Sequence, residues 1–289
     1  MNQAIQNMLT RYTCETRPQF ERALKEILQE LALVGLWRAR FFEHAAFYGG
    51  TALRILYGLD RFSEDMDFTL LNPDPSFSLD YYNSFIRSEL EAYGFDVEVE
   101  GRPKVWQTAV QSAFIKTNTL GELLKIGVPT HLVKGFHLQT QLRIKFEIDT
   151  DPAPAYRTES RFLNMPITVG IRSVVLEDVF AGKMHALLFR EWKGCVKGRD
   201  WFDWLWLVRM GAKLNLERLA IHLRSSGFFT ASDILTRERF EKLMFDKIAS
   251  LDLDSALSDL RPFISDSAQI ADWSKEMLCH FVGQTQTIQ

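Results

Sequence analysis

Hydrophobic residues recur at steps of three and four through residues 18–34, and this spacing predicts an amphipathic helix. A second helix is expected over residues 36–46. The pattern then changes to a short apolar run, residues 45–48, which stops at the glycine pair Gly49 and Gly50. Such a run predicts a buried strand that enters a tight turn.

The residues after the glycine pair predict a helix and then a strand. Residues 51–57 have a helical pattern, with Thr51 able to cap the start and Gly58 placed to end it. Residues 66–71 are mostly apolar and stop at a turn that contains two prolines, as a strand would. The expected order is therefore strand, Gly-Gly turn, helix, strand.

More strands are expected after a helix over residues 79–93, at residues 95–100, 110–116 and 137–149. In the last of these, charged residues alternate with apolar ones. The alternation predicts a half-buried strand with one charged face, formed by Arg143, Lys145, Glu147 and Asp149.

Helical periodicity dominates from residue 176 onward. Helices are expected near residues 176–192, 199–210, 214–225, 236–250, 253–264 and 270–282. The whole pattern predicts an α/β (α+β) fold, with a mixed, mainly antiparallel sheet and flanking helices in residues 1–170 and a helical domain in residues 171–289. We expect the active site in the cleft between these two domains.

Composition narrows the class of protein. Of 289 residues, 46% are hydrophobic and 25% charged, which is ordinary for a globular protein. The net charge of -3 argues against a protein that coats nucleic acid through bulk charge, but it leaves room for local basic patches. One candidate patch for phosphate contacts is Lys193, Lys197 and Arg199.

The three cysteines, Cys14, Cys195 and Cys279, lack the spacing of a zinc site and do not form an even set for disulfides. A reducing cytoplasm is the expected location. We see neither an export signal nor a run of about 20 apolar residues, so no membrane partner is expected.

Two carboxylates lie at the start of the strand predicted at residues 66–71. Asp65 and Asp67 are two residues apart, so both side chains leave the same face of the sheet, with Cα atoms about 6 to 7 Å apart. Such a pair can hold Mg²⁺ or Mn²⁺, which prefer oxygen ligands and complete their shell with substrate phosphate. Glu147 is the preferred third carboxylate because it lies between two apolar residues, and Asp149 is the alternative.

Gly49, Gly50 and Thr51 precede a helix, where free N–H groups favour an anion and glycine lets a phosphate approach the backbone. The turn lacks the spacing of a Walker loop. Taken alone, the glycine pair is better explained by an ordinary turn, and each carboxylate pair by a solvated strand. The order of Gly-Gly-Thr, helix, paired aspartates and a later strand carboxylate is what indicates chemistry at a phosphate.

Three stretches carry a resemblance to a known family: FYGGTALRILYGLDRFSEDMDFTL at residues 47–70, IKFEID at residues 144–149, and LEDVFAGKMHALLFREWKGCVKGRDWFDWLWL at residues 176–207. In these stretches the sequence resembles the AbiEii-type nucleotidyltransferases. These are toxins of bacterial type IV toxin–antitoxin and phage-defence systems, within the DNA polymerase β superfamily. The resemblance implies a polymerase-β-like nucleotidyltransferase domain.

The resemblance also implies roles for individual residues. The implied catalytic residues are Asp65, Asp67, Glu147, Lys183 and Asp203, of which the first three, with Asp149 as the alternative, would bind metal. The implied nucleotide-binding residues are Gly49, Gly50, Thr51, Ser63, Lys183, Arg199 and Asp200. Ser63 matches the serine of the SxDxD pattern, and Arg199, Asp200 and Asp203 match the RDxxD motif.

The residues of the third stretch also have simpler interpretations. Lys183 has the pattern of a solvated lysine on an amphipathic helix, and Asp200 and Asp203 suit the first turn of a helix. The nearby tryptophans indicate core rather than a platform for bases. His185 is expected to be structural or on the surface.

The expected activity is transfer of a nucleoside monophosphate from ATP, CTP or GTP to an acceptor hydroxyl, with release of pyrophosphate. By resemblance the acceptor is RNA, in particular a tRNA 3′ end, and an antitoxin is the expected protein partner. Two alternatives stay open. One is transfer to a small molecule or a protein hydroxyl, including Ser63, and the other is an inactive nucleotide-binding regulator.

Overall fold

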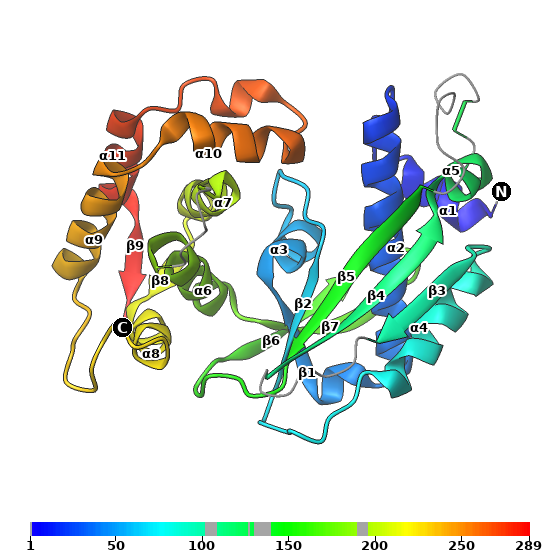
Figure 1. The fold of residues 1–289 in the computed structure, drawn as a ribbon, viewed down its shortest axis with the longest axis horizontal. Helices are drawn as coiled ribbons and strands as arrows, with labels where there is room; N and C mark the ends of the chain where they lie inside the picture. The colour runs from blue at the N-terminus through cyan, green and yellow to red at the C-terminus, as the bar shows by residue number, and fades with distance from the viewer. Residues whose placement is uncertain (1, 102–108, 127, 130–139, 190–195) are drawn as a thin grey trace. The chain divides into compact units, whose positions relative to one another are not determined.

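The computed structural model describes residues 2–101, 109–126, 128–129, 140–189 and 196–289 (Figure 1). Contacts divide the chain into two compact units. The sheet unit comprises Met1–Tyr57, Glu64–Pro152 and Ser160–Ser173, and the helical unit comprises Gly58–Ser63, Ala153–Glu159 and Val174–Gln289. The chain therefore leaves the sheet unit twice for short segments. The domains expected from the sequence, residues 1–170 and 171–289, do not assign these two segments to the helical unit.

A seven-stranded sheet forms the centre of the sheet unit, with strand order β3-β4-β5-β2-β1-β7-β6. The β1/β2, β3/β4 and β4/β5 pairs are antiparallel, and the β1/β7 and β2/β5 pairs are parallel. The predicted mixed α/β fold is thus confirmed. The strands are β1 (Ala45–Tyr48), β2 (Met66–Leu70), β3 (Val97–Gly101), β4 (Val110–Asn118), β5 (Gln141–Asp149), β6 (Thr158–Leu163) and β7 (Val169–Val174).

The helices of this unit cover an aromatic core. Phe47, Phe68 and Phe146 come from three neighbouring strands and stack with ring centroids 4.9 and 4.5 Å apart. The two longest helices, α2 and α4, pack against each other beside the sheet (Figure 1). The helices are α1 (Gln3–Leu9), α2 (Arg17–Arg38), α3 (Gly49–Tyr57), α4 (Asp80–Ala92) and α5 (Thr119–Lys125).

The helix predicted over residues 36–46 is wrong. Helix α2 runs on to Arg38, and Arg40 then takes a left-handed conformation with φ of 59°. A 3-10 turn, η1 (Phe41–Glu43), follows before β1. The turn places Phe41 edge-on against Phe68, with centroids 5.1 Å apart, so burial of aromatic rings overrides the helical spacing.

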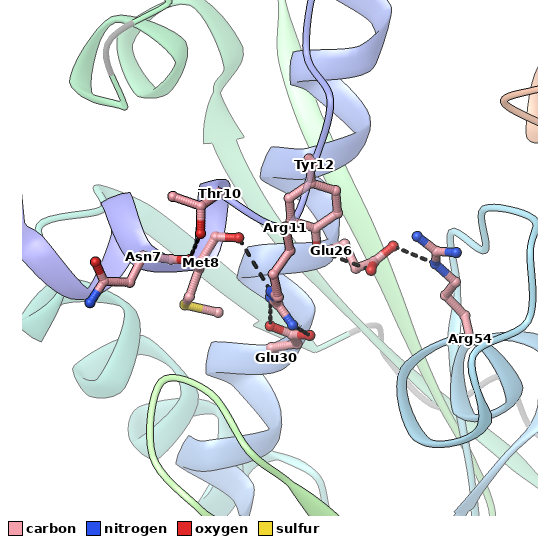
Figure 2. A network of polar contacts seen from close by, with 8 residues as sticks. All are labelled: Asn7, Met8, Thr10, Arg11, Tyr12, Glu26, Glu30 and Arg54. Atoms are coloured by element: carbon pink, nitrogen blue, oxygen red, sulfur yellow. Dashed lines mark hydrogen bonds and ion pairs between the residues drawn. The ribbon is translucent and has the colours of Figure 1, made fainter.

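A polar network joins the N-terminal segment to α2 and α3 (Figure 2). Arg11 binds Glu30, with 2.9 Å between Nη1 and Oε1, and the Tyr12 hydroxyl donates to Glu26. Arg54 of α3 donates to the other oxygen of Glu26, at 2.9 Å. Burial raises the pKa of Glu30, and its ion pair with Arg11 opposes that shift. The network fixes the helix that follows the Gly-Gly turn.

The helical unit contains the helices α6 (Leu176–Phe189), α7 (Gly198–Arg209), α8 (Leu216–Ser225), α9 (Arg237–Ala249), α10 (Leu253–Leu260) and α11 (Lys275–Gln284). Short turns η2 (Arg261–Phe263) and η3 (Ser267–Ile270) separate the last two. The helix predicted at residues 270–282 starts later, since the Ser274 hydroxyl accepts from the N–H of Met277 as a cap. A short parallel pair, β8 (Lys213–Asn215) and β9 (Gln286–Ile288), was not predicted.

Most residues of helix α7 are buried. Trp201, Trp204 and Trp206 are 3%, 0% and 9% exposed, which confirms that they are core residues. A Cβ on Gly198 would lie 1.8 Å from the carbonyl oxygen of Ala256, so the start of α7 touches the backbone of α10 and only glycine fits there. Across the described residues, no helix has both the length and the apolar character needed to cross a membrane.

Candidate active site

The sequence-predicted site residues fall into two groups, one in each unit. Gly49, Gly50, Thr51, Asp65, Asp67, Glu147 and Asp149 belong to the sheet unit, and Ser63, Lys183, Arg199, Asp200 and Asp203 to the helical unit. Each group has its own geometry.

Asp67 and Glu147 lie directly opposite each other on neighbouring parallel strands. The register of β2 and β5 pairs Asp67 with Glu147, and the flanking Phe68 and Phe146 are buried. Because side chains alternate along a strand, both carboxylates leave the face opposite these rings. Neighbouring strands are about 4.8 Å apart, so the two carboxylates can reach one ligand.

Gly49 brings the turn before α3 against this pair. Its φ is +80°, and a Cβ built there would lie 2.4 Å from Oδ2 of Asp67. Any other residue would be strained by the backbone angle and would push the Asp67 carboxylate away. The sequence predicted glycine in this turn because a phosphate could then approach the backbone. The contact with the Asp67 carboxylate is a second reason why only glycine fits.

Thr51 forms a hydrogen bond with the backbone of Asp65. Its side chain is fully buried, and its hydroxyl donates to the carbonyl oxygen of Asp65. Thr51 does not cap α3, because the helix already begins at Gly49. Asp65 itself is exposed, immediately before β2. The Thr51 hydroxyl thus fixes the segment that carries the paired aspartates.

The two candidates for the third carboxylate differ in their surroundings. Glu147 accepts from the Ser112 hydroxyl at 3.2 Å and pairs with Lys145 at 2.8 Å. Asp149 is one step further along, opposite Thr69, and accepts the N–H of Asp151. Burial raises the pKa of Asp149. The register therefore puts Glu147, and not Asp149, beside Asp67.

In the helical unit, Lys183 lies on a buried carboxylate. Its Nζ is 2.7 Å from Oδ2 of Asp203, and the Lys183 side chain is 15% exposed. Arg61 binds the same carboxylate through two bonds, Nε to Oδ1 at 2.6 Å and Nη2 to Oδ2 at 2.7 Å. We call Arg61, Lys183 and Asp203 the buried charge cluster.

Asp203 is 0% exposed, and both of its oxygens are engaged. Burial alone would raise the pKa of Asp203, but the charges of Arg61 and Lys183 outweigh it and lower the pKa. Asp203 therefore stays ionised in the core. Its contacts suit a group that positions the two cations rather than one that touches a ligand.

No local pattern in the sequence indicates Arg61, which is 142 residues from Asp203. The segment that carries it is tied down within the helical unit. The N–H of Phe62 donates to the carbonyl of Phe263 at 2.7 Å, and Arg61 forms an isolated β-bridge with Ile264. Four residues after Arg61 the chain reaches Asp65.

With this geometry in view, comparison with known proteins gives a family. Residues 31–276 match the family described as "Nucleotidyl transferase AbiEii toxin, Type IV TA system". The match covers more than half of the chain. The chain belongs to the AbiEii family. It is therefore a nucleotidyltransferase of a toxin family, and membership implies an NTP substrate and an antitoxin partner.

Two solved structures are similar to this chain. JHP933 from Helicobacter pylori matches with a TM-score of 0.50 at 16% identity, over 91% of this chain and 88% of that chain. A second H. pylori structure, described as a candidate nucleotidyltransferase, matches with a TM-score of 0.49 at 16% identity over 90% of each chain. At this identity the likeness to JHP933 shows the fold alone. No curated protein matches the sequence.

All the predicted site residues of this AbiEii protein lie within the matched range, and so does Arg61. Most of the network of Figure 2 does not, because Arg11, Tyr12, Glu26 and Glu30 precede residue 31. Apart from Arg54, the residues that form this network are thus outside the part of the chain that matches the family.

The predicted basic patch is partly neutralised. Lys197 and Arg199 both approach Asp259, at 3.5 and 3.6 Å, and the Arg199 guanidinium also lies 4.1 Å from the centroid of the Phe263 ring. Lys193 lies outside the described residues. Asp200 and Ser63 are half-buried, and their roles in nucleotide binding stay predictions. His185 accepts from or donates to the Ser226 hydroxyl at 2.9 Å, in keeping with a structural role.

Proposed function

We propose that this AbiEii nucleotidyltransferase uses a divalent cation to transfer a nucleoside monophosphate from an NTP to an RNA hydroxyl, with a tRNA 3′ end as the acceptor. The observation that carries the proposal is the placement of Asp67 opposite Glu147, with the Gly49 turn against Asp67. Family membership supports the reaction class.

The donor chemistry of this face fits Mg²⁺ or Mn²⁺. Carboxylate oxygens suit hard cations, and Mg²⁺ is commonly held by one or two carboxylates with substrate phosphates completing its shell. Among the described residues, no three His, Cys, Asp or Glu side chains form a ready metal cluster, so substrate oxygens would be needed. Asp65, Asp67 and Glu147 would hold the ion, which when bound supplies charge neutralisation on the phosphates.

The Gly49 turn supports the same conclusion. The first N–H groups of α3 favour an anion, but a phosphate there would meet the Asp67 carboxylate. A phosphate and the Asp67 carboxylate repel each other at such a short distance, and a cation between them would offset this repulsion. The turn and the carboxylates are therefore best explained as one site for a nucleotide with its metal.

Glu147 is the group best placed to take the proton of the attacking hydroxyl. Lys145 and Ser112 orient its carboxylate, both through Oε1. Its second oxygen has two lone pairs, one for the ion and one for the proton. Asp149 is less suited, because the strand register places it opposite Thr69 and not opposite Asp67.

Lys183 would stabilise the leaving pyrophosphate. An ammonium has three donors, and the ion pair with Asp203 fixes the position of Lys183 while part of the side chain stays exposed. Asp203 and Arg61 act as positioning residues in this proposal. The Asp203 carboxylate, itself held by Arg61, keeps the Lys183 ammonium in place through their ion pair.

The test follows the α-phosphate. Purified protein is incubated with each α-labelled NTP, Mg²⁺ and total cellular RNA, and the labelled species are separated. We expect label on RNA of tRNA size at its 3′ end. Label on a small molecule, or on the protein with loss in a Ser63→Ala variant, would replace the RNA acceptor with the alternative one. Binding of NTP without pyrophosphate release would indicate an inactive regulator and contradict the proposal.

A further inference from the structure

A cavity in the helical unit lies apart from the carboxylates of the sheet unit. It has a volume of about 240 Å³ and is lined mainly by one face of α7. Phe202, Trp206 and Arg209 on that face are spaced as residues of one helical stripe. Trp273 faces Phe202 with ring centroids 6.4 Å apart and planes 25° from parallel. The cavity thus has flat aromatic walls.

Two buried polar atoms of the lining have no hydrogen-bond partner among the described residues. They are Nε1 of Trp273, whose residue is 7% exposed, and Oε1 of Gln269, which precedes it in η3. Buried polar groups are nearly always paired, and leaving one unpaired costs free energy. One of these atoms is a donor and the other an acceptor, so the pair is suited to a ligand that offers both.

Two charged residues complete the lining. The side chains of Asp60 and Arg209 form no hydrogen bond or ion pair with another described residue, although the Arg209 guanidinium lies 5.3 Å from the centroid of the Phe281 ring. An acceptor and a donor of opposite charge disfavour a simple anion or a simple cation. Together with Trp273 and Gln269, they favour a ligand with both donors and acceptors along its edge.

We propose that this cavity binds a nucleobase. A nucleobase has a flat face that stacks on aromatic rings and an edge that carries both donors and acceptors. The volume is sufficient, since a cavity of about 150 Å³ already holds benzene, and a base is somewhat larger. A fatty acid would leave the donors and acceptors of the cavity unpaired.

The position of the cavity links it to the buried charge cluster. Asp60 is next to Arg61 in the chain, and Phe202 is next to Asp203. The base can belong to the NTP or to the end of the RNA acceptor, and the choice between these sources rests on the proposed function. The binding of a base in this cavity does not rest on the proposed function, because it needs neither metal nor phosphate.

The experiment measures calorimetric binding of adenosine, guanosine, cytidine and uridine, without phosphate or metal. We expect at least one nucleoside to bind, and Trp273→Phe to weaken it about 2- to 12-fold, because the ring stays and one hydrogen bond is lost. Trp37→Phe, the same change at an exposed position of the sheet unit, should leave the affinity unchanged. Gln269→Leu gives a second, independent test if Trp273→Phe does not fold.

The source of the base follows from kinetics of the Trp273→Phe variant. A raised KM for NTP alone assigns the base to the nucleotide, and a raised KM for RNA alone assigns it to the acceptor. If neither KM changes while nucleoside binding weakens, the cavity is a separate base-binding site, which also supports the proposal. Absence of nucleoside binding, equal binding of free ribose, or unchanged affinity in both variants would overturn it, whatever the outcome for nucleotidyl transfer.

Discussion

Removing Arg61 should destabilise the protein far more than removing Lys183. Arg61→Met deletes both bonds to the fully buried Asp203 carboxylate and leaves it with one partly exposed lysine. Breaking a buried ion pair from one side costs about 3 to 5 kcal/mol, because the remaining charge is uncompensated. Lys183→Met leaves both Arg61 bonds in place, so we expect a loss of about 1 kcal/mol, as for a typical hydrogen bond.

The assay is urea unfolding followed by tryptophan fluorescence, since Trp201, Trp204 and Trp206 report on the helical unit. Arg17→Met is the matched control. It deletes an arginine that pairs with Glu21 at 3.0 Å with 45% and 33% of the side chains exposed. Exposed pairs contribute about 0 to 1 kcal/mol. If Arg61→Met were no more destabilising than Arg17→Met, the buried charge cluster would not be what holds the segment before Asp65.

Three further predictions concern single positions. Gly49→Ala should abolish transfer, because the new Cβ meets the Asp67 carboxylate. Gly58→Ala has the same φ of +80° but open space around it, so it should only lower stability by about 1 kcal/mol. Pyrophosphate release measures the first effect and urea unfolding the second. Glu147→Gln should remove transfer while Asp149→Asn keeps most of it, and the opposite result in the same assay would exchange their roles. Burial, and then the charge of Arg218, lowers the pKa of His222 to about 4 from 6.5, so as pH falls the unfolded state binds the proton first and stability is lost between pH 6.5 and about 4. The loss is about 3 kcal/mol at most, and a His222→Gln variant should lack it when unfolding is measured at both pH values.

The sequence predicted those parts of the site that depend on local patterns. A short apolar run before Gly49 and the spacing of Asp65 and Asp67 are visible within a few residues. The run forms β1, which pairs with β2, and β2 contains Asp67 and directly follows Asp65. The two-residue spacing of Glu147 and Asp149 was also visible, but the sequence could not tell which one faces Asp67. That choice is set by strand register, which depends on the packing of the whole sheet.

Partners that are far apart in the chain could not be predicted either, because their contacts also depend on the packing of the whole fold. Arg61 lies in a short loop with no periodic pattern, and nothing near it in the chain indicates that it binds Asp203. The helix predicted over residues 36–46 is wrong because Arg40 has a left-handed backbone. The burial of Phe41, and not the residue type of Arg40, accounts for this conformation. Strands β6 and β7 were missed because each is short and polar on one side.

The central claim is that the paired aspartates hold the cation used in transfer. It is tested most directly by pyrophosphate release from NTP with Mg²⁺ and RNA, measured for the wild type and for Asp67→Asn. Asp67 is half-buried at a strand end, so the replacement should leave the urea midpoint nearly unchanged. We predict that Asp67→Asn releases no more pyrophosphate than a sample with the cation chelated. A variant that kept the wild-type rate and the wild-type dependence on Mg²⁺ would contradict the account.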